Sequence, residues 1–212
     1  MRYLNLQSRH NHHGFTLIEI MVAVSIFAIV ALITTGALIT VSNTNRKAQA
    51  IKLAIDNVNF ALDSMILNFR EGSLFNCISG EVNESNLLSY FVSKPNDCQS
   101  GGDALVFKSE RSTVDASAPY RLYYLKPSTG DEPGRLEVVY QSDCASGCGP
   151  VELTSPEVSI EKLKFYVRNA KSPNKLPNIT VVLKGQVIGR YPTTFALETT
   201  VAARPIIPGL NT

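Results

Sequence analysis

The sequence predicts an α+β fold in which one long N-terminal helix precedes a β-rich domain. Three observations lead to this prediction. Residues 15–41 are almost entirely apolar, and residues 42–71 repeat apolar side chains at helical spacing. Residues 72–212 then contain short strand-like runs separated by turns. A helical segment followed by a series of strands is typical of an α+β arrangement, whereas α/β folds alternate the two.

The first 14 residues, MRYLNLQSRHNHHG, form a polar leader with no acidic residue and with two arginines, Arg2 and Arg9. The apolar run that follows has one charged residue, Glu19. About 20 apolar residues at 1.5 Å each span a ~30 Å hydrocarbon core, so residues 15–41 are predicted to cross a membrane. A positive leader is expected to stay in the cytoplasm, which places the remainder across the membrane. Secretory signal peptides differ, because their apolar region has only about 7–15 residues.

The helix is predicted to continue through residue 71, since no proline interrupts residues 15–71 and Gly72 is a reasonable stop. Its second half has apolar residues on one face: Ile51, Ile55, Val58, Leu62, Met65 and Phe69. Such a stripe is found in coiled coils and on helices packed against their own domain. The second interpretation is favoured here because strands follow.

Residues 73–102 are rich in Gly, Pro and Asn and are predicted to be irregular. Strands are predicted at Ala104–Lys108, Tyr120–Leu125, Arg135–Gln141, Val158–Arg168, Ile179–Lys184 and Phe195–Val201. These runs are rich in Val, Thr and Tyr and are bounded by Gly, Pro and Asn. They therefore favour an antiparallel sheet.

All four cysteines, Cys77, Cys98, Cys144 and Cys148, follow the apolar run. An even number in a part predicted to lie outside the cytoplasm indicates two disulfides. Three connectivities are possible, and Cys77–Cys98 with Cys144–Cys148 is favoured because each pair flanks a loop-like stretch. A zinc site with all four cysteines is the alternative, although the gap between the last two fits paired zinc ligands only loosely.

Charge and histidine content argue against several function classes. Of the 20 Lys and Arg residues, two are in the leader, and the other 18 balance 18 Asp and Glu, so no basic field indicates nucleic acid. All three histidines, His10, His12 and His13, also lie in the leader. A polar leader explains them better than a metal site does. Without a histidine elsewhere, Ser-His-Asp and Cys-His chemistry are excluded from the remainder.

No nucleotide-binding or hydrolase motif is present either, and Asp131 with Glu132 lies in a turn-like segment. Asp97 and Asp103 could contribute to a calcium loop, but the spacing of the acids does not match an EF-hand. The prediction is therefore a non-enzymatic protein without a cofactor, with calcium as the open alternative.

The hexapeptide Gly14-Phe15-Thr16-Leu17-Ile18-Glu19, followed by a spanning apolar run, resembles the prepilin peptidase site of type IV pilins and type II secretion pseudopilins. The resemblance implies cleavage between Gly14 and Phe15 and methylation of the new Phe15 amine. It also implies that Glu19 pairs with the N-terminal amine of a neighbouring subunit. A carboxylate in an apolar span costs about 3 kcal/mol and needs a partner, which agrees with that role. The alternative is that Glu19 only caps its own helix.

The same resemblance implies a structural subunit of a filament, with its C-terminal domain outside the inner membrane. Its partners would be prepilin peptidase, other pilin or pseudopilin subunits, an inner-membrane assembly platform and membrane lipid. A weaker likeness to J-type minor pseudopilins and related minor pilins rests on Leu163–Arg168, Leu176–Leu183 and Phe195–Arg204. The size also favours a minor subunit over the alternative, a major pilin. A different class, a signal-anchored enzyme or binding domain that forms no filament, predicts that Glu19 can be replaced without consequence.

Overall fold

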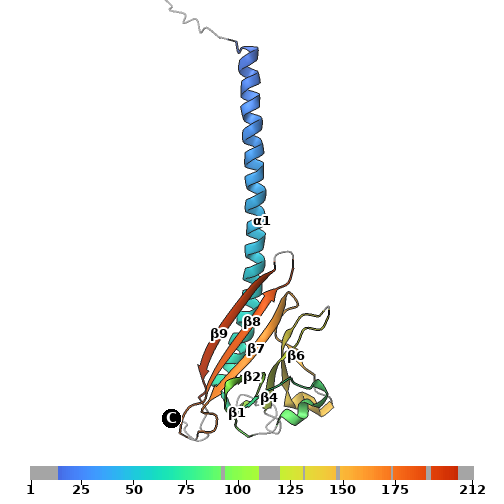
Figure 1. Cartoon of the computed structure of the whole chain (residues 1–212), viewed down its shortest axis with the longest axis vertical. Coiled ribbons are helices and arrows are strands. Elements are labelled where there is room, and N and C mark those ends of the chain that lie inside the picture. Colours follow the sequence, from blue (N-terminus) through green and yellow to red (C-terminus); the bar gives the residue numbers. More distant parts are fainter. Residues whose placement is uncertain are drawn as a thin grey trace, which may run out of the picture. The chain divides into compact units, whose positions relative to one another are not determined.

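We analysed a computed structural model of the chain. The structure describes residues 14–91, 94–109, 120–130, 132–146, 149–172, 174–189 and 192–204. The chain divides into two compact units, Met1–Lys47 and Ala48–Thr212, which are described separately. The helix α1 (Leu17–Arg70) begins in the first unit and ends in the second (Figure 1).

The end of α1 is set by close packing around Gly72. A Cβ atom at this position would lie 2.6 Å from Cδ2 of Phe107 and 3.0 Å from Cζ of Phe75, so a larger residue would not fit. The carbonyl of Arg70 accepts a hydrogen bond of 2.8 Å from the backbone N–H of Arg204. One of the carbonyls left without a partner at the helix end is thereby satisfied.

The described part of the second unit contains two antiparallel sheets. The first has the order β1-β3-β4-β5-β6 and comprises β1 (Gly72–Ile78), β3 (Ala104–Ser109), β4 (Tyr120–Lys126), β5 (Arg135–Tyr140) and β6 (Val151–Glu152). The second has the order β2-β7-β8-β9 and comprises β2 (Cys98–Gly102), β7 (Val158–Arg168), β8 (Asn178–Val187) and β9 (Thr193–Ala202). Two 3-10 helices, η1 (Glu84–Tyr90) and η2 (Gln141–Ser146), lie between strands.

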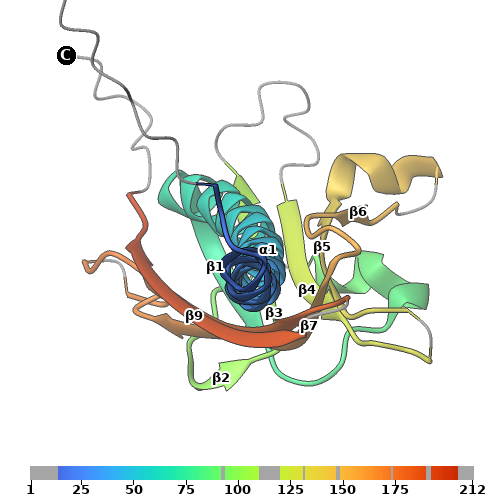
Figure 2. The same ribbon diagram turned by 90° about the horizontal axis from the view of Figure 1, so that it is seen from above.

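The main core joins the second half of α1 to both sheets. The strands β7, β8 and β9 curve around this part of the helix (Figure 2). The buried residues of α1 are Ala54, Val58, Ala61, Leu62, Met65 and Phe69. The ring of Phe69 is fully buried and meets the rings of Phe107 and Tyr123 edge-on, at centroid distances of 5.2 and 5.5 Å. Aromatic pairs favour this geometry beyond the gain from burial.

A smaller core covers the opposite face of the first sheet. There, Leu87 of η1 and the adjacent Phe91 pack on Val106, Leu122 and Val139. The central strands of this sheet are therefore buried on both faces, which explains why they read as nearly continuous apolar runs.

The predicted α+β class is confirmed, with a long helix packed on antiparallel strands. All six predicted strands exist, with ends that differ by up to three residues, but they contribute to two sheets rather than one. The predicted helix stripe is confirmed from Val58 onward. Ile51 and Ile55 are only half-buried, because Ala54 and Ala61 complete the packed face instead.

The prediction that residues 73–102 are irregular is wrong, because β1, η1 and β2 lie in or across this range. The pairing of β1 with β3 shifts register between Ser73 and Asn76, and Leu74 has a φ of 52°. Such a bulge removes the strict alternation of side chains that identifies a strand in a sequence. The strand β2 is Gly-rich and is held by a disulfide, which a propensity argument does not detect.

Candidate functional site

The candidate site is the start of α1, where the sequence predicts processing and assembly. Thr16 precedes the first helical residue and acts as the cap. Its hydroxyl oxygen and its carbonyl oxygen both accept from the backbone N–H of Glu19, at 3.3 and 3.1 Å. Thr followed three residues later by Glu is the sequence pattern of a capping box. The local sequence therefore forms a defined helix start without help from another segment.

The carboxylate of Glu19 has no hydrogen bond or ion pair with any residue in the described part of the chain. Together with Phe15, Ala23 and Val24 it lines a shallow, mostly apolar hollow along the helix. A free acid beside the first turn is favoured by the helix dipole, which agrees with the capping interpretation. Its surroundings are otherwise apolar, so a cation placed there would meet a single, otherwise unpaired negative charge.

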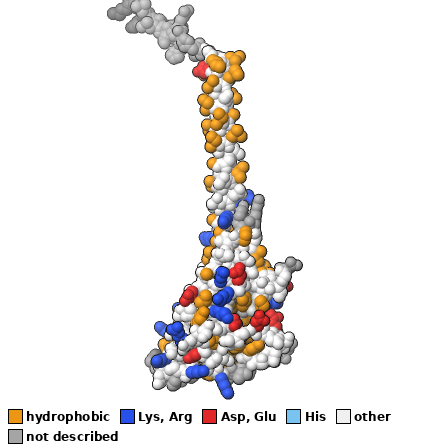
Figure 3. Space-filling model, viewed as in Figure 1, with side chains coloured by type: hydrophobic (Ala, Val, Ile, Leu, Met, Phe, Trp, Pro, Cys, Tyr) orange, Lys and Arg blue, Asp and Glu red, His pale blue; other side chains and the backbone are white. Residues whose placement is uncertain are grey.

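The first half of α1 is apolar on all sides and exposed. Apolar side chains cover its surface (Figure 3), and Phe15 and Leu17 are 80% and 79% exposed. By length and composition, α1 is able to cross a membrane. Helices that are apolar all round lie in protein cores or in membranes.

The hydroxyl groups in this segment are satisfied within the helix itself. Ser25 donates to the carbonyl of Met21 at 2.8 Å, and Thr35 donates to the carbonyl of Ala31 at 2.7 Å. Thr34 likewise bonds the preceding turn at 2.9 Å. In hydrocarbon an unsatisfied polar group is costly, so these bonds make the segment compatible with a lipid environment.

A line of exposed apolar residues continues along the second half of α1. Leu53, Phe60 and Leu67 are 64%, 74% and 51% exposed and recur every seven residues, so they lie along one helix face. They lie outside the face buried against the sheets. Only the buried stripe was predicted from the sequence. A search for apolar residues spaced seven apart would also have found this exposed line.

The structure contains the favoured Cys77–Cys98 disulfide, with a Cα–Cα distance of 5.9 Å. Cys144 is also disulfide-bonded, and none of the described cysteines is free. Cys148, its predicted partner, lies outside the described residues. The alternative of a zinc site with four cysteine ligands is wrong, because sulfurs in a disulfide are not available as thiolate ligands.

The two acids considered for calcium bind protein groups. A carboxylate oxygen of Asp97 accepts from the N–H of Ala170 at 2.6 Å. Asp103 accepts from the N–H of Gly80 at 2.9 Å and from Nζ of Lys164 at 2.5 Å. Burial alone would raise the pKa of Asp103, but the bonds from Lys164 and Gly80 outweigh it and hold that pKa below its usual value. Within the described ranges, no group of three His, Cys, Asp or Glu residues is arranged to hold a metal ion.

Several predicted residues lie outside the described residues: Arg2, Arg9, His10, His12 and His13 of the leader, and Asp131.

The structure also shows a buried polar pair that was not predicted from the sequence. Glu137 is 2% exposed and accepts a hydrogen bond of 2.5 Å from the Tyr124 hydroxyl. The pair lies within the first sheet, so we interpret it as structural.

Comparison with known families gives a match at the site itself. Residues 9–35 match the family model described as "Prokaryotic N-terminal methylation motif". The chain carries a prepilin-type N-terminus. The match includes the end of the leader and the first turns of α1, and therefore Gly14, Phe15 and Glu19. Searches of curated proteins and of solved structures gave no match. The pilin-like class that this motif indicates consists generally of non-enzymatic structural subunits.

Proposed function

We propose that this pilin-like protein is a minor pseudopilin or minor pilin, a subunit that enters a filament through its N-terminal helix. The observation that carries the proposal is the methylation motif directly before an exposed, spanning apolar helix with a single carboxylate. In the proposed processing, prepilin peptidase removes residues 1–14, and the amine of Phe15 is then methylated. Residues 15–41 cross the inner membrane, residues 42–71 extend the helix, and residues 72–212 form the domain outside the cytoplasm.

Assembly is proposed to bury the Glu19 carboxylate and the apolar surface of α1, which are exposed in the separate chain. The cation that meets Glu19 is the N-terminal amine of a neighbouring subunit, because cleavage before Phe15 creates a positive charge in an otherwise apolar segment. In a low dielectric such a pair attracts strongly, and either charge alone is heavily penalised. The pairing would set the axial register of one subunit against the next. The exposed line through Leu53, Phe60 and Leu67 supports the same picture, because it offers further helix surface for a neighbour.

Two observations support a minor rather than a major subunit. The three segments that resemble J-type minor pseudopilins fall on β7, β8 and β9, which are successive strands of one sheet. The domain is also elaborate, since its described residues form two sheets and two 3-10 helices. The disulfide supports the proposed location, since disulfides persist in oxidising compartments outside the cytoplasm. Counting copies per filament would distinguish the minor subunit from a major pilin.

The decisive experiment is the intact mass and N-terminal sequence of the membrane-extracted protein, for the wild type and for Glu19→Gln. We expect a chain that starts at Phe15 and is heavier by one methyl group. The variant should be cleaved in the same way but fail to enter filaments, because the amine of its neighbour then has no counter-charge. Ser25→Ala is the matched control in the same segment and should still enter filaments.

Three results would contradict the proposal. A chain that keeps residues 1–14, or one that is cut beyond Val41, would identify a signal anchor or a secreted domain instead. Normal recovery of Glu19→Gln in filaments would overturn the assembly role of the carboxylate. A wild-type protein that is found in no filament would favour a membrane-anchored binding domain.

A further inference from the structure

Among the described residues, the strand β9 forms a long sheet edge with no neighbouring strand on its outer side. It pairs with β8 over ten residues, from Thr193 to Ala202, in an unbroken register. Only alternate residues of an edge strand bond to the neighbouring strand, so the others direct their N–H and C=O groups away from the sheet. Among the described residues, no backbone group outside β8 bonds to β9 between Thr194 and Ala202. In Figure 1, β9 lies at the outer side of its sheet.

In the described part of the chain, the other sheet edges are occupied, short or irregular. The outer side of β1 is occupied by Asn96, which donates to the carbonyl of Phe75 at 3.0 Å and accepts from the N–H of Cys77 at 3.4 Å. The edge strand β6 has two residues. The edge strand β2 is short, has an irregular register against β7, and is tied by its first residue, Cys98, to β1. Short strands and bulges are the usual devices against edge-to-edge pairing, whereas β9 has no bulge, proline or lysine.

The core is also incomplete beside this edge. On the inner face of β8, Ile179, Val181 and Leu183 are fully buried. On β9, Phe195 and Leu197 face the same core but are only half-buried. The difference arises because β8 has a strand on each side and β9 has a strand on one. A further strand with apolar side chains on its inner face would cover them.

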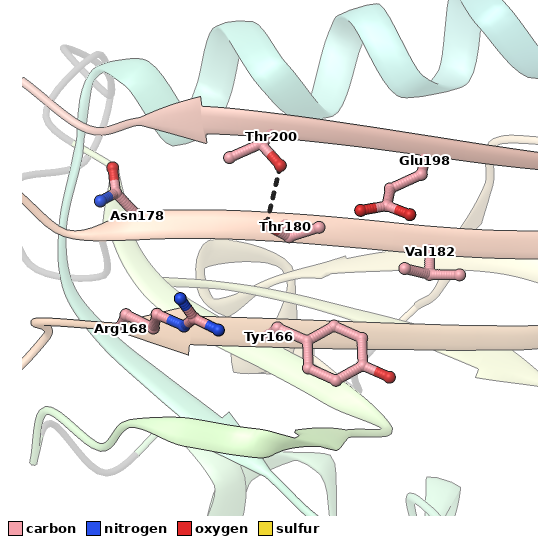
Figure 4. A pocket seen from close by; sticks show the side chains of 7 residues that line it. All are labelled: Tyr166, Arg168, Asn178, Thr180, Val182, Glu198 and Thr200. Carbon is pink, nitrogen blue, oxygen red and sulfur yellow. Dashed lines mark hydrogen bonds between the residues drawn. The ribbon is translucent and has the colours of Figure 1, made fainter.

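The outer face of β9 carries one charge and borders a shallow hollow that it shares with β7 and β8. Figure 4 shows Thr200 and Glu198 on β9, with Thr180 beside them on β8. The two threonine hydroxyls form a hydrogen bond of 2.8 Å, and Glu198 has no ion pair among the described residues. A strand added here would place side chains directly opposite those of β9, and a Lys or Arg opposite Glu198 would be favoured.

We propose that β9 accepts an extended segment of a different subunit, which adds a strand to this sheet. This inference rests on the proposed filament function. The segment has apolar residues on its inner row and a basic residue opposite Glu198. Its main-chain groups pair with the free groups of β9, as in other cases of strand addition.

A different subunit fits better than a second copy of this chain. In the described part of the chain, β9 is the one long open edge, so two copies in head-to-tail order have no second edge to pair with it. An antiparallel pair of two β9 strands centred on each other would place the two Glu198 carboxylates opposite or diagonal to each other on one face, and like charges there are destabilising.

Amide hydrogen exchange tests the inference on the full-length protein. Exchange in β9 is measured by mass spectrometry in filaments or subunit complexes and in detergent-extracted protein. We expect about half of the amides between Thr194 and Ala202 to become protected on assembly, by at least about 100-fold. The amides of β8 are the internal control, because this strand has a neighbour on each side in both states.

Two adjacent proline variants separate folding from assembly. Along a strand successive N–H groups point to opposite sides, so in Thr199→Pro and Thr200→Pro one variant loses a bond to β8 and the other loses an edge-facing donor. We expect the variant that loses a bond to β8 to lower Tm by about 5 °C or more. The variant that loses only an edge-facing donor should keep its Tm, but the amount recovered in assemblies should fall at least about tenfold. If both variants are unstable, the exchange measurement on the wild type decides.

The outcomes are distinguishable. Assemblies in which β9 exchanges as fast as in the extracted protein would overturn the strand-addition inference and leave the filament function intact. Protection that appears in the extracted protein alone, and increases with its concentration, would identify a second copy and overturn the assignment to a different subunit. A wild-type protein that enters no assembly would overturn the proposed function, and the inference with it.

Discussion

The two halves of α1 share one continuous helix but bury their apolar residues in different ways. From Leu17 to Lys47, no side chain in the described structure is classed as buried. From Ala48 to Arg70, six residues are buried against two sheets. Each half carries enough apolar residues to need a partner, and the second half finds one within its own chain.

The comparison shows that helix formation and helix burial are separate requirements. Backbone bonds and good helix formers suffice for a helix, whereas stability in water comes mainly from packing one apolar face. The second half meets that requirement with its own domain. The first half meets it only in a membrane or among neighbouring subunits. Substitutions in the two halves should therefore affect different measurements.

The largest expected effect is that of Phe69→Ala. Phe69 is fully buried among the rings of Phe75, Phe107 and Tyr123, so its loss should destabilise the domain by about 3–5 kcal/mol. The free energy of unfolding in denaturant would measure it. Phe60→Ala is the matched control on the same helix: Phe60 is 74% exposed, and its replacement should change stability by less than about 0.5 kcal/mol.

The same pair of variants also tests whether the exposed line on α1 is free in the separate chain. Phe60→Ala should be as stable as the wild type in detergent. It should nevertheless enter filaments less efficiently, because a neighbouring subunit then loses an apolar contact with this face of α1. Equal destabilisation by the two variants would mean that the exposed line on α1 is packed within the chain.

Removal of the disulfide should have the next largest effect. The bond closes a loop of 21 residues in sequence separation. Loss of that constraint on the unfolded chain should cost roughly 3 kcal/mol in the double variant Cys77→Ala/Cys98→Ala. Thermal unfolding followed by far-UV circular dichroism would show the domain melting earlier while the signal of the apolar helix persists. Unchanged melting would show that β1 and β2 hold together without the bond.

The sequence was sufficient to predict the features that depend on periodicity. The length of α1, the buried positions Val58, Leu62, Met65 and Phe69, and the six strands all follow from apolar spacing and turn residues. The start of the helix was predictable for a local reason, because Thr16 and Glu19 form a cap with no distant partner.

What could not be predicted depends on contacts distant in sequence. The strand β1 was hidden by a bulge at Leu74, and β2 is held by Cys77 and by pairing with β7. The division of the strands into two sheets depends on which strands pair, and pairing between strands distant in sequence, such as β2 with β7, is not visible in a local pattern. The open edge of β9 is a property of its position beside β8 and of the absence of a further described strand, not of its residues.

The pH dependence of the domain should show a smaller effect at high pH. Burial, with a contribution from Tyr140, raises the pKa of Tyr123 to about 12. In the unfolded chain this tyrosine ionises at about pH 10, so the unfolded state releases its proton before the folded state does. The free energy of unfolding therefore falls between about pH 10 and 12, by on the order of 2 kcal/mol. Denaturant unfolding at several pH values would measure this, with Tyr123→Phe as the control that reduces the slope. Part of the slope should remain in the variant, because burial and the bond to Glu137 also raise the pKa of Tyr124. An identical slope in the variant would assign the loss to other groups.

The smallest expected effect compares two carboxylates. Asp103 is paired with Lys164 inside the domain, whereas Glu19 has no partner in the described part of the chain. Since the side chain of Asp103 is 36% exposed, Asp103→Asn should cost less than about 1 kcal/mol at pH 7. The pKa of Asp103 is lowered, so its contribution is present above the pKa of the unfolded chain and is lost as pH falls through the lower, folded value. The wild type and the variant should therefore converge in acid. Glu19→Gln should change the free energy of unfolding of the domain by less than about 0.5 kcal/mol and should act mainly on filament entry, because within the described chain this carboxylate is favoured only by the dipole of its first helical turn. A loss of stability in Glu19→Gln would show that this carboxylate already has a partner within its own chain before assembly.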